Sequence, residues 1–235
     1  RAGMELPETD YSAEDRKDRD IKTRLLEINK IAATYYYHQL KSEAAKSGLD
    51  YLVKRGLSDK TINSFGLGYA PQSTGELYRM LKDKGYDDGI LKESGLFTYE
   101  KGVRDKFWNR VIFPIMDINN KVIGFGGRVM GDAKPKYLNS PETKLFDKSR
   151  NLYGLNAART ARKNNLIICE GYMDVISLHQ AGFTQAVASL GTALTPGHAR
   201  LMKRYTDNVL ITYDSDEAGV KAALRASPIL KEAGL

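Results

Sequence analysis

Acidic side chains gather at the end of an apolar run near the C-terminus. The segment "LITYDSDEAGVKAAL" (210–224) places Asp214 and Asp216 directly after that run. Side chains two residues apart on an extended chain point the same way, so these two carboxylates are expected to aim at one point. Glu170 ends an earlier apolar run, "NLIICE", and Asp174 follows it by four residues, one helical turn on. These four acids are the first candidates for chemistry.

A cluster of like charges persists if a cation compensates it or if some groups stay protonated. Oxygen ligands with no nearby His or Cys favour a hard ion, Mg²⁺ or Mn²⁺, over zinc. The alternative is helix capping: Asp216 could cap the following helix, and Asp174 could be a solvated helix position. That alternative is favoured for Asp174 by itself. Glu170, Asp214 and Asp216 together favour metal, because three caps need not converge.

The elements that must position these acids follow Arg162. Three apolar runs, "NLIICE", "QAVASL" and "NVLITYD", alternate with helical stretches. This alternation is typical of parallel strands joined by crossover helices. In an open parallel sheet, ligands bind at the carboxyl ends of the strands, where these acids lie. Residues 164–235 are therefore predicted to form a doubly wound α/β unit. The sheet is expected to be incomplete, because the chain stops straight after a helix.

The preceding residues indicate a different architecture. Residues 1–20 are charged and almost without periodicity, and are expected to be a linker or arm. Helical spacing of apolar residues predicts a helix from residue 21 to about residue 48, ending at a Gly, and Ser58 is a predicted N-cap. "RVIFPIMDINNKVIGFGGRVM" predicts a β-hairpin with its turn at Asn119 and Asn120. Residues 21–163 are thus predicted to be a mixed α+β subdomain.

Charge is unevenly distributed along the chain. The net charge is +7, yet residues 101–163 hold 14 basic and 5 acidic side chains, so the rest sums to −2. A basic middle suggests a surface for a polyanion such as nucleic acid, although charge alone leaves a merely solvated face equally open.

Composition also indicates the cellular environment in which the protein is expected to work. The mean hydropathy is −0.44, and no apolar run approaches the roughly 20 residues of a membrane span. The opening residues lack the apolar region of a signal peptide. Cys169 is the single cysteine, which excludes an internal disulfide and a Cys-based zinc site and fits a reducing cytoplasm.

Several motifs carry a family resemblance. "EGYMDVI", "ASLGTALT" and "YDSDEAG" resemble the TOPRIM domain of bacterial DNA primases of the DnaG type, a domain shared with topoisomerases and some nucleases. "RVIFPIMDINNKVIGFGGR" and "KYLNSPETKLFDKSRNLYGL", with "YLVKRGLS" and "GLGYAP" upstream, resemble the amino-terminal subdomain of the primase polymerase core. The resemblance runs from about Leu49 to the end. It implies an α/β fold, in which a mixed α+β amino-terminal subdomain precedes a Rossmann-like TOPRIM subdomain truncated at its C-terminus.

The resemblance also implies roles for individual residues. Glu170 would be the leading catalytic acid, as a metal ligand or a base, with Asp214 and Asp216 holding Mg²⁺ or Mn²⁺ and Asp174 supporting them. Lys148 and Asn139 would contact the nucleotide. The residues expected to bind the template are Arg55, Arg128, Lys136 and Tyr137. The zinc-binding domain, a later aspartate pair and the helicase-binding domain of the family are missing from this sequence, so weak or no activity is expected of the 235 residues by themselves.

The function implied is synthesis of short RNA primers on single-stranded DNA by metal-dependent nucleotidyl transfer. The expected partners are single-stranded DNA, ribonucleoside triphosphates and, through an absent domain, the replicative helicase; a cytoplasmic monomer without membrane contact is expected. Two alternatives remain. The first is another TOPRIM enzyme, a nuclease or topoisomerase. The second is a non-catalytic module that binds single-stranded DNA, which leaves the carboxylates unexplained.

Overall fold

The first helix lies across one face of an antiparallel sheet. The computed structural model describes residues 13–73, 75–100 and 102–235. Helix α1 (Ala13–Gln39) buries side chains that recur every three or four residues. It therefore begins inside the segment expected to be an arm, and the rest of that arm lies outside the described residues. The buried face of α1 contains Leu25, Ile28, Ala32 and Tyr36.

The predicted helix over residues 21–48 is in fact three elements. After α1 ends at Gln39 come η1 (Glu43–Ala45) and α2 (Lys46–Lys54). Gly48 does not end a helix: it lies buried in α2, where an added Cβ would sit 2.7 Å from the Tyr69 ring. Close packing, rather than helix termination, requires the glycine there.

Three further short helices connect and cover the sheet. Helix α3 (Asp59–Ser64) begins as predicted, because the Ser58 hydroxyl accepts the Thr61 N–H at 3.2 Å. Helices α4 (Glu76–Asp83) and α5 (Asp88–Glu93) pack beside α1.

The sheet of this half is antiparallel, in the order β1-β4-β5-β6. Its central strands β4 and β5 form the predicted hairpin, in which the Asp117 carboxylate accepts the N–H groups of Asn119 and Lys121 and Asn120 has a φ of 61°. A two-stranded ribbon pairs β2 with β3. The strands are β1 (Gly68–Ala70), β2 (Phe97–Thr98), β3 (Arg104–Asp105), β4 (Arg110–Met116), β5 (Val122–Val129) and β6 (Tyr137–Asn139).

The C-terminal half is the predicted parallel α/β unit. Its three strands have the order β8-β7-β9, and both pairings are parallel. Strand β9 is an edge with alternating exposure, Leu210 being 52% exposed, so the third apolar run is not fully buried. The elements are α6 (Leu155–Ala158), β7 (Leu166–Cys169), α7 (Tyr172–Gln180), β8 (Ala186–Ala188), α8 (Pro196–Lys203), β9 (Val209–Thr212) and α9 (Glu217–Glu232).

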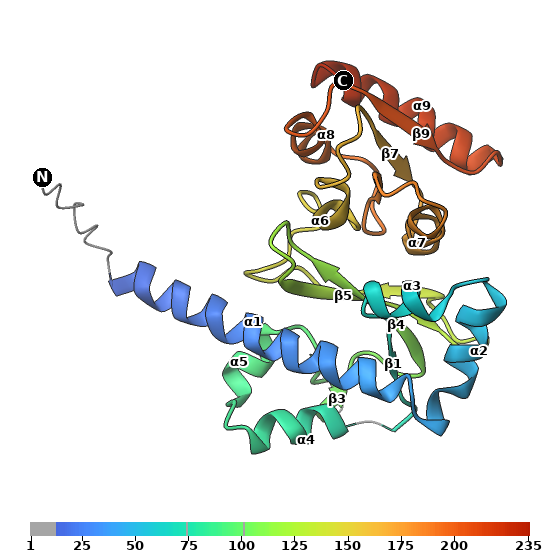
Figure 1. Cartoon of the computed structure of the whole chain (residues 1–235). Helices are drawn as coiled ribbons and strands as arrows, with labels where there is room; N and C mark the ends of the chain where they lie inside the picture. The colour runs from blue at the N-terminus through green and yellow to red at the C-terminus, as the bar shows by residue number, and fades with distance from the viewer. Residues whose placement is uncertain (1–12, 74, 101) are drawn as a thin grey trace, which may run out of the picture.

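The two halves meet on β4 and β5. Strand β4 is buried on both faces: Phe113 belongs to a core shared with α7, whereas Ile112 belongs to the core beneath α1. Figure 1 shows the α6–α9 half on one side of these strands and α1, α4 and α5 on the other. Tyr172 of α7 stacks on Phe113 at 4.9 Å between ring centroids. A Cβ on Gly126 of β5 would lie 2.4 Å from the Tyr172 ring, so this glycine admits the aromatic contact.

None of the helices in the described ranges is long and apolar enough to cross a membrane.

Candidate functional site

The ends of β7 and β9, which carry Glu170 and Asp214, lie side by side in the parallel sheet. Strands β7 and β9 are neighbours, with Cys169 opposite Thr212, so Glu170 and Asp214 leave the sheet at the same edge. Glu170 Oε1 accepts the backbone N–H of Asp214 at 2.9 Å. Glu170 is thereby hydrogen-bonded to the backbone of the segment that carries Asp214 and Asp216.

Gly219 lets the third acid approach. Asp216 Oδ1 accepts the Gly219 N–H at 2.7 Å and caps α9. A Cβ on Gly219 would lie 2.1 Å from the Asp214 carbonyl oxygen and 2.8 Å from Glu170 Oε1. The carboxylates of Glu170 and Asp216 and the backbone of Asp214 therefore lie around one glycine at the start of α9. A cavity of about 440 Å³ beside them is lined by Glu170 and Asp216 and by Arg225 of α9.

Asp174 serves as a cap in the first turn of α7. Its Oδ2 accepts the Gly171 N–H at 3.0 Å. Burial raises the pKa of the Asp174 carboxyl, the Gly171 N–H opposes that rise, and the negative charge of Asp214 adds to it. Asp174 thus stabilises its helix while lying close enough to Asp214 to feel its charge.

The carboxylates suit a hard cation that is shared with a substrate. Within the described residues, no three His, Cys, Asp or Glu side chains lie close enough to form a metal cage by themselves. Mg²⁺ commonly takes only one or two protein carboxylates and completes its shell with water and substrate phosphates. The oxygen donors and the charge repulsion between Asp174 and Asp214 fit that kind of site.

Arg55 and Arg128, two of the predicted template-binding residues, lie close to the ring of Tyr51, which none of the sequence motifs singled out. The Arg128 guanidinium lies 4.0 Å from the centroid of the Tyr51 ring, and the Arg55 guanidinium lies 5.5 Å from it. Arg128 and Tyr137 are direct cross-strand partners on β5 and β6. Arg128 Nε is buried and has no hydrogen-bond partner among the described residues. Aromatic stacking holds these cations without neutralising them.

Tyr137 combines a packed ring with an accessible edge. Its ring lies 6.3 Å from that of Tyr172 and 6.5 Å from that of Phe113, and 39% of the residue is exposed. Burial raises the pKa of Tyr137 to about 12, so its hydroxyl stays protonated at neutral pH. The neighbouring Lys136 is exposed. We define Tyr51, Arg55, Arg128 and Tyr137 as the basic aromatic face, which Lys136 adjoins in sequence.

Asn139 joins the two halves of the protein. Its Oδ1 accepts the Tyr172 hydroxyl at 2.7 Å, and its Nδ2 donates to the Leu190 carbonyl at 2.8 Å. This use of the amide leaves one N–H for the predicted nucleotide contact.

Lys148 has a basic neighbour that the sequence analysis did not single out. Burial lowers the pKa of the Lys106 ammonium, and the positive charge of Lys148 lowers it further. Among the ion pairs of the described residues, none includes Lys106 or Lys148. Lys106 lies near enough to Lys148 to feel its charge, and two like charges of this kind suit an anion such as a phosphate group.

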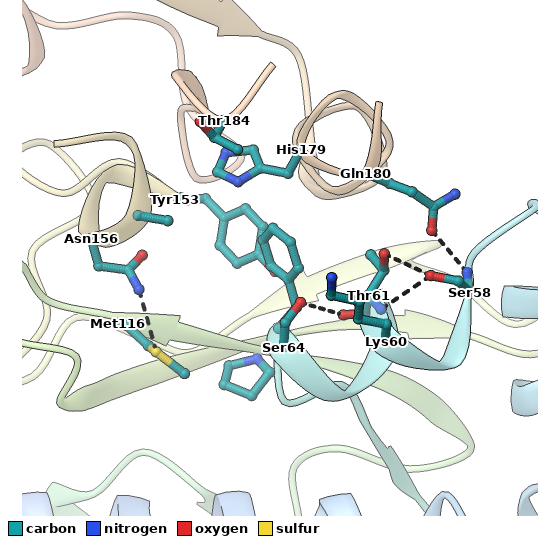
Figure 2. A pocket seen from close by; sticks show the side chains of 14 residues that line it. Ser58, Lys60, Thr61, Ser64, Met116, Tyr153, Asn156, His179, Gln180 and Thr184 are labelled. Atoms are coloured by element: carbon teal, nitrogen blue, oxygen red, sulfur yellow. Dashed lines mark hydrogen bonds between the residues drawn. The ribbon is translucent and has the colours of Figure 1, made fainter. Parts of the chain in front are cut away.

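A second cavity, of about 350 Å³, lies between the halves. Figure 2 shows α3 residues on one wall and α6 and α7 residues on the other. At its edge Gln180 accepts the Ser58 N–H at 2.8 Å and donates to the Gly56 carbonyl at 2.7 Å. The cavity contains none of the predicted site residues, but these two bonds tie α7 to the loop that follows Arg55.

Some residues missed in the sequence had a detectable signal. Tyr51 precedes Arg55 by four residues in a helical stretch, a spacing that places both on one face. Lys106 and Gln180 had no comparable signal, because their partners are 42 and 122–124 residues away along the chain.

Comparison with known proteins assigns both halves. Residues 35–159 match the family described as DNA primase catalytic core, N-terminal domain, and residues 167–235 match the family described as Toprim-like. The chain belongs to the DnaG-type DNA primase catalytic-core family. The expected fold, an α+β subdomain followed by a TOPRIM subdomain, is confirmed.

The DNA primases that this chain resembles are longer proteins. The chain is 50% identical to the DNA primase of Clostridium acetobutylicum over 220 aligned residues. The alignment covers 93% of this chain and 37% of that protein. The chain is 47% identical over 230 residues to the DNA primase of Deinococcus radiodurans, covering 95% and 38%. The chain therefore spans less than two fifths of the length of these primases.

Solved structures agree in fold. A DnaG primase catalytic domain bound to single-stranded DNA superposes with a TM-score of 0.82 and 42% identity, covering 90% of this chain and 66% of the other. The zinc-binding and RNA polymerase domains of the Aquifex aeolicus primase superpose with a TM-score of 0.84 and 36% identity, covering 98% and 56%.

Proposed function

We propose that this chain forms the catalytic core of a DNA primase, which makes short RNA primers on single-stranded DNA. The observation that carries the proposal is that one fold holds both the basic aromatic face and the neighbouring strand ends that bear Glu170, Asp214 and Asp216. A related catalytic domain has been solved with single-stranded DNA bound, which supports the template role.

The basic aromatic face would hold the template strand. Arg55, Arg128 and Lys136 would neutralise phosphates, and the exposed edge of Tyr137 would contact an unpaired base. Because Arg128 is already fixed over the Tyr51 ring, little side-chain freedom remains to be lost on binding.

Lys148 and Lys106 would hold the triphosphate of the incoming nucleotide, and the remaining N–H of Asn139 would add a contact. Asp214 and Asp216 would hold Mg²⁺ or Mn²⁺, which when bound neutralises charge on the transferring phosphoryl group. Glu170 has one oxygen engaged by the Asp214 N–H, and the other would bind the cation or accept a proton from the primer hydroxyl. Asp174 would support the site through the first turn of α7.

The partners expected with this function are single-stranded DNA, ribonucleoside triphosphates and, through sequence outside this chain, the replicative helicase. The setting would be the cytoplasmic replication fork, and the working unit a monomer.

The test uses a primase of the length of the curated relatives that contains this chain as its core. Glu170→Gln should reduce RNA synthesis on single-stranded template by about 100-fold or more, the usual contribution of a catalytic acid or base, and leave template affinity intact. Glu43→Gln, a change at an exposed acid in η1, is the matched control. Activity of Glu170→Gln near that of the control contradicts the assigned role. DNA cleavage or relaxation by the wild type would indicate another TOPRIM enzyme, and template binding without synthesis a binding module.

A further inference from the structure

The loop that carries Lys148 is folded by its own side chains. Asp147 Oδ1 accepts both the N–H and the hydroxyl of Ser149, at 2.8 and 2.6 Å. The Asp147 carbonyl accepts the Arg150 N–H at 3.2 Å and the Asn151 amide at 2.7 Å. These local bonds shape residues 147–151, but they do not attach the loop to the rest of the protein.

The start of α8 makes that attachment. His198 is fully buried, and its Nδ1 accepts the Thr195 N–H at 3.2 Å. An imidazole nitrogen that accepts carries no proton, so in the neutral ring the proton is on Nε2. His198 Nε2 therefore donates to the Lys148 carbonyl, at 2.7 Å.

Two neighbours of His198 hold the next residue of the loop. The Thr195 hydroxyl donates to the Ser149 carbonyl at 2.7 Å and also accepts the His198 N–H at 3.1 Å. A Cβ on Gly197 would lie 2.6 Å from the Ser149 carbonyl oxygen, so only glycine allows the helix to approach this closely. In the sequence "TPGH", the Thr195 hydroxyl therefore bonds the Ser149 carbonyl and the His198 imidazole bonds the Lys148 carbonyl. Gly197 between them leaves room for the loop.

We propose that His198 is a positioning residue for the nucleotide, acting through the backbone of Lys148. The inference rests on the proposed function, in which the Lys148 ammonium meets the triphosphate. Its new content is that affinity for the nucleotide depends on a buried histidine of the TOPRIM half, which itself touches no substrate. Holding the Lys148 carbonyl limits where the ammonium can reach, and a fixed charge loses less entropy on binding than a mobile one.

The experiment is a double-mutant cycle on this chain, with Mg²⁺-ATP binding as the readout. In His198→Asn the shorter side chain retains an oxygen near the position of Nδ1, so the Thr195 cap is kept while the donor to Lys148 is lost. Lys148→Ala leaves the backbone carbonyl in place. Lys148→Ala should weaken ATP binding by about tenfold, the usual effect of losing one charge-assisted contact, and His198→Asn, which keeps the ammonium but loses its anchor, should weaken it by up to that factor. The double variant should be no weaker than Lys148→Ala, because both changes remove the same contact.

A matched control separates positioning from stability. Met202→Ala opens the buried core beside α8 without touching the loop, so it should lower the melting temperature and leave ATP affinity unchanged. Two results would overturn this inference and leave the proposed function standing. In the first, the fold losses of ATP affinity in the two single variants multiply in the double variant. In the second, Met202→Ala loses as much ATP affinity as His198→Asn. Absence of ATP binding by the wild-type chain would overturn the proposed nucleotide role together with this inference.

Discussion

At the scale of single residues, one carboxylate can serve both the fold and the site. Asp216 caps α9 through Oδ1 and lines the cavity beside Glu170. The sequence presented capping and metal binding as alternatives for this residue. The structure shows the cap, and it leaves the second oxygen of the carboxylate available for the proposed cation.

Two substitutions at Asp216 should separate these roles. Asp216→Asn keeps a good capping group, so the melting temperature should hold while Mn²⁺ affinity falls. Asp216→Ala should lose both, and the lost cap should lower the melting temperature by about 2–4 °C. Thermal melts of metal-free protein and Mn²⁺ titrations check both variants. Mn²⁺ affinity of Asp216→Asn equal to that of the wild type would leave Asp216 as a cap only.

At the scale of elements, α7 links the acids to the basic aromatic face. Its first turn carries Asp174, and its last residue, Gln180, holds the loop after Arg55 by two hydrogen bonds. A shift of this helix would therefore move the Asp174 carboxylate and the loop after Arg55, a proposed template residue, together.

Gln180→Ala should loosen the Arg55 loop. Both bonds to Gly56 and Ser58 are lost, so the Ser58 amide should exchange its hydrogen faster and affinity for single-stranded DNA should fall by about threefold. Ser177→Ala, one turn earlier on the exposed side of α7, is the control and should leave both unchanged. Unchanged Ser58 exchange in Gln180→Ala would show that the loop is held by other contacts.

The sequence pattern predicted those elements that are determined by residues close together in the sequence. The hairpin turn at Asn119 and Asn120, the Ser58 cap and the three parallel strands are confirmed, since turn chemistry and apolar runs specify them. Gly48 was wrongly predicted to end a helix, because the close approach of the Tyr69 ring from strand β1, which requires a glycine there, is not visible in the local pattern. Likewise, the Tyr51–Arg128 and His198–Lys148 contacts join residues far apart in sequence, which periodicity does not reveal.

At the scale of the whole molecule, the basic segment 101–163 contributes Arg128 to the basic aromatic face, and Arg55 joins it from the end of α2. Single-stranded DNA should bind there with a strong dependence on salt. Arg128→Ala should weaken binding and make the log–log salt slope shallower by about 0.7, the contribution of one phosphate contact. Lys84→Ala, beyond the end of α4, should leave the slope unchanged. An unaltered slope in Arg128→Ala would place the template elsewhere.

The acids at the ends of β7 and β9 and the Lys148 loop are proposed to form one site for a metal-bound nucleotide. Paramagnetic broadening of backbone amide signals by Mn²⁺ tests this most directly on the chain itself. Mn²⁺ alone should broaden residues 171–174 and 214–219 first, and addition of ATP should extend the broadening to residues 147–149. Broadening centred on other acids, such as those of α1, with the strand ends and the Lys148 loop unaffected, would contradict it.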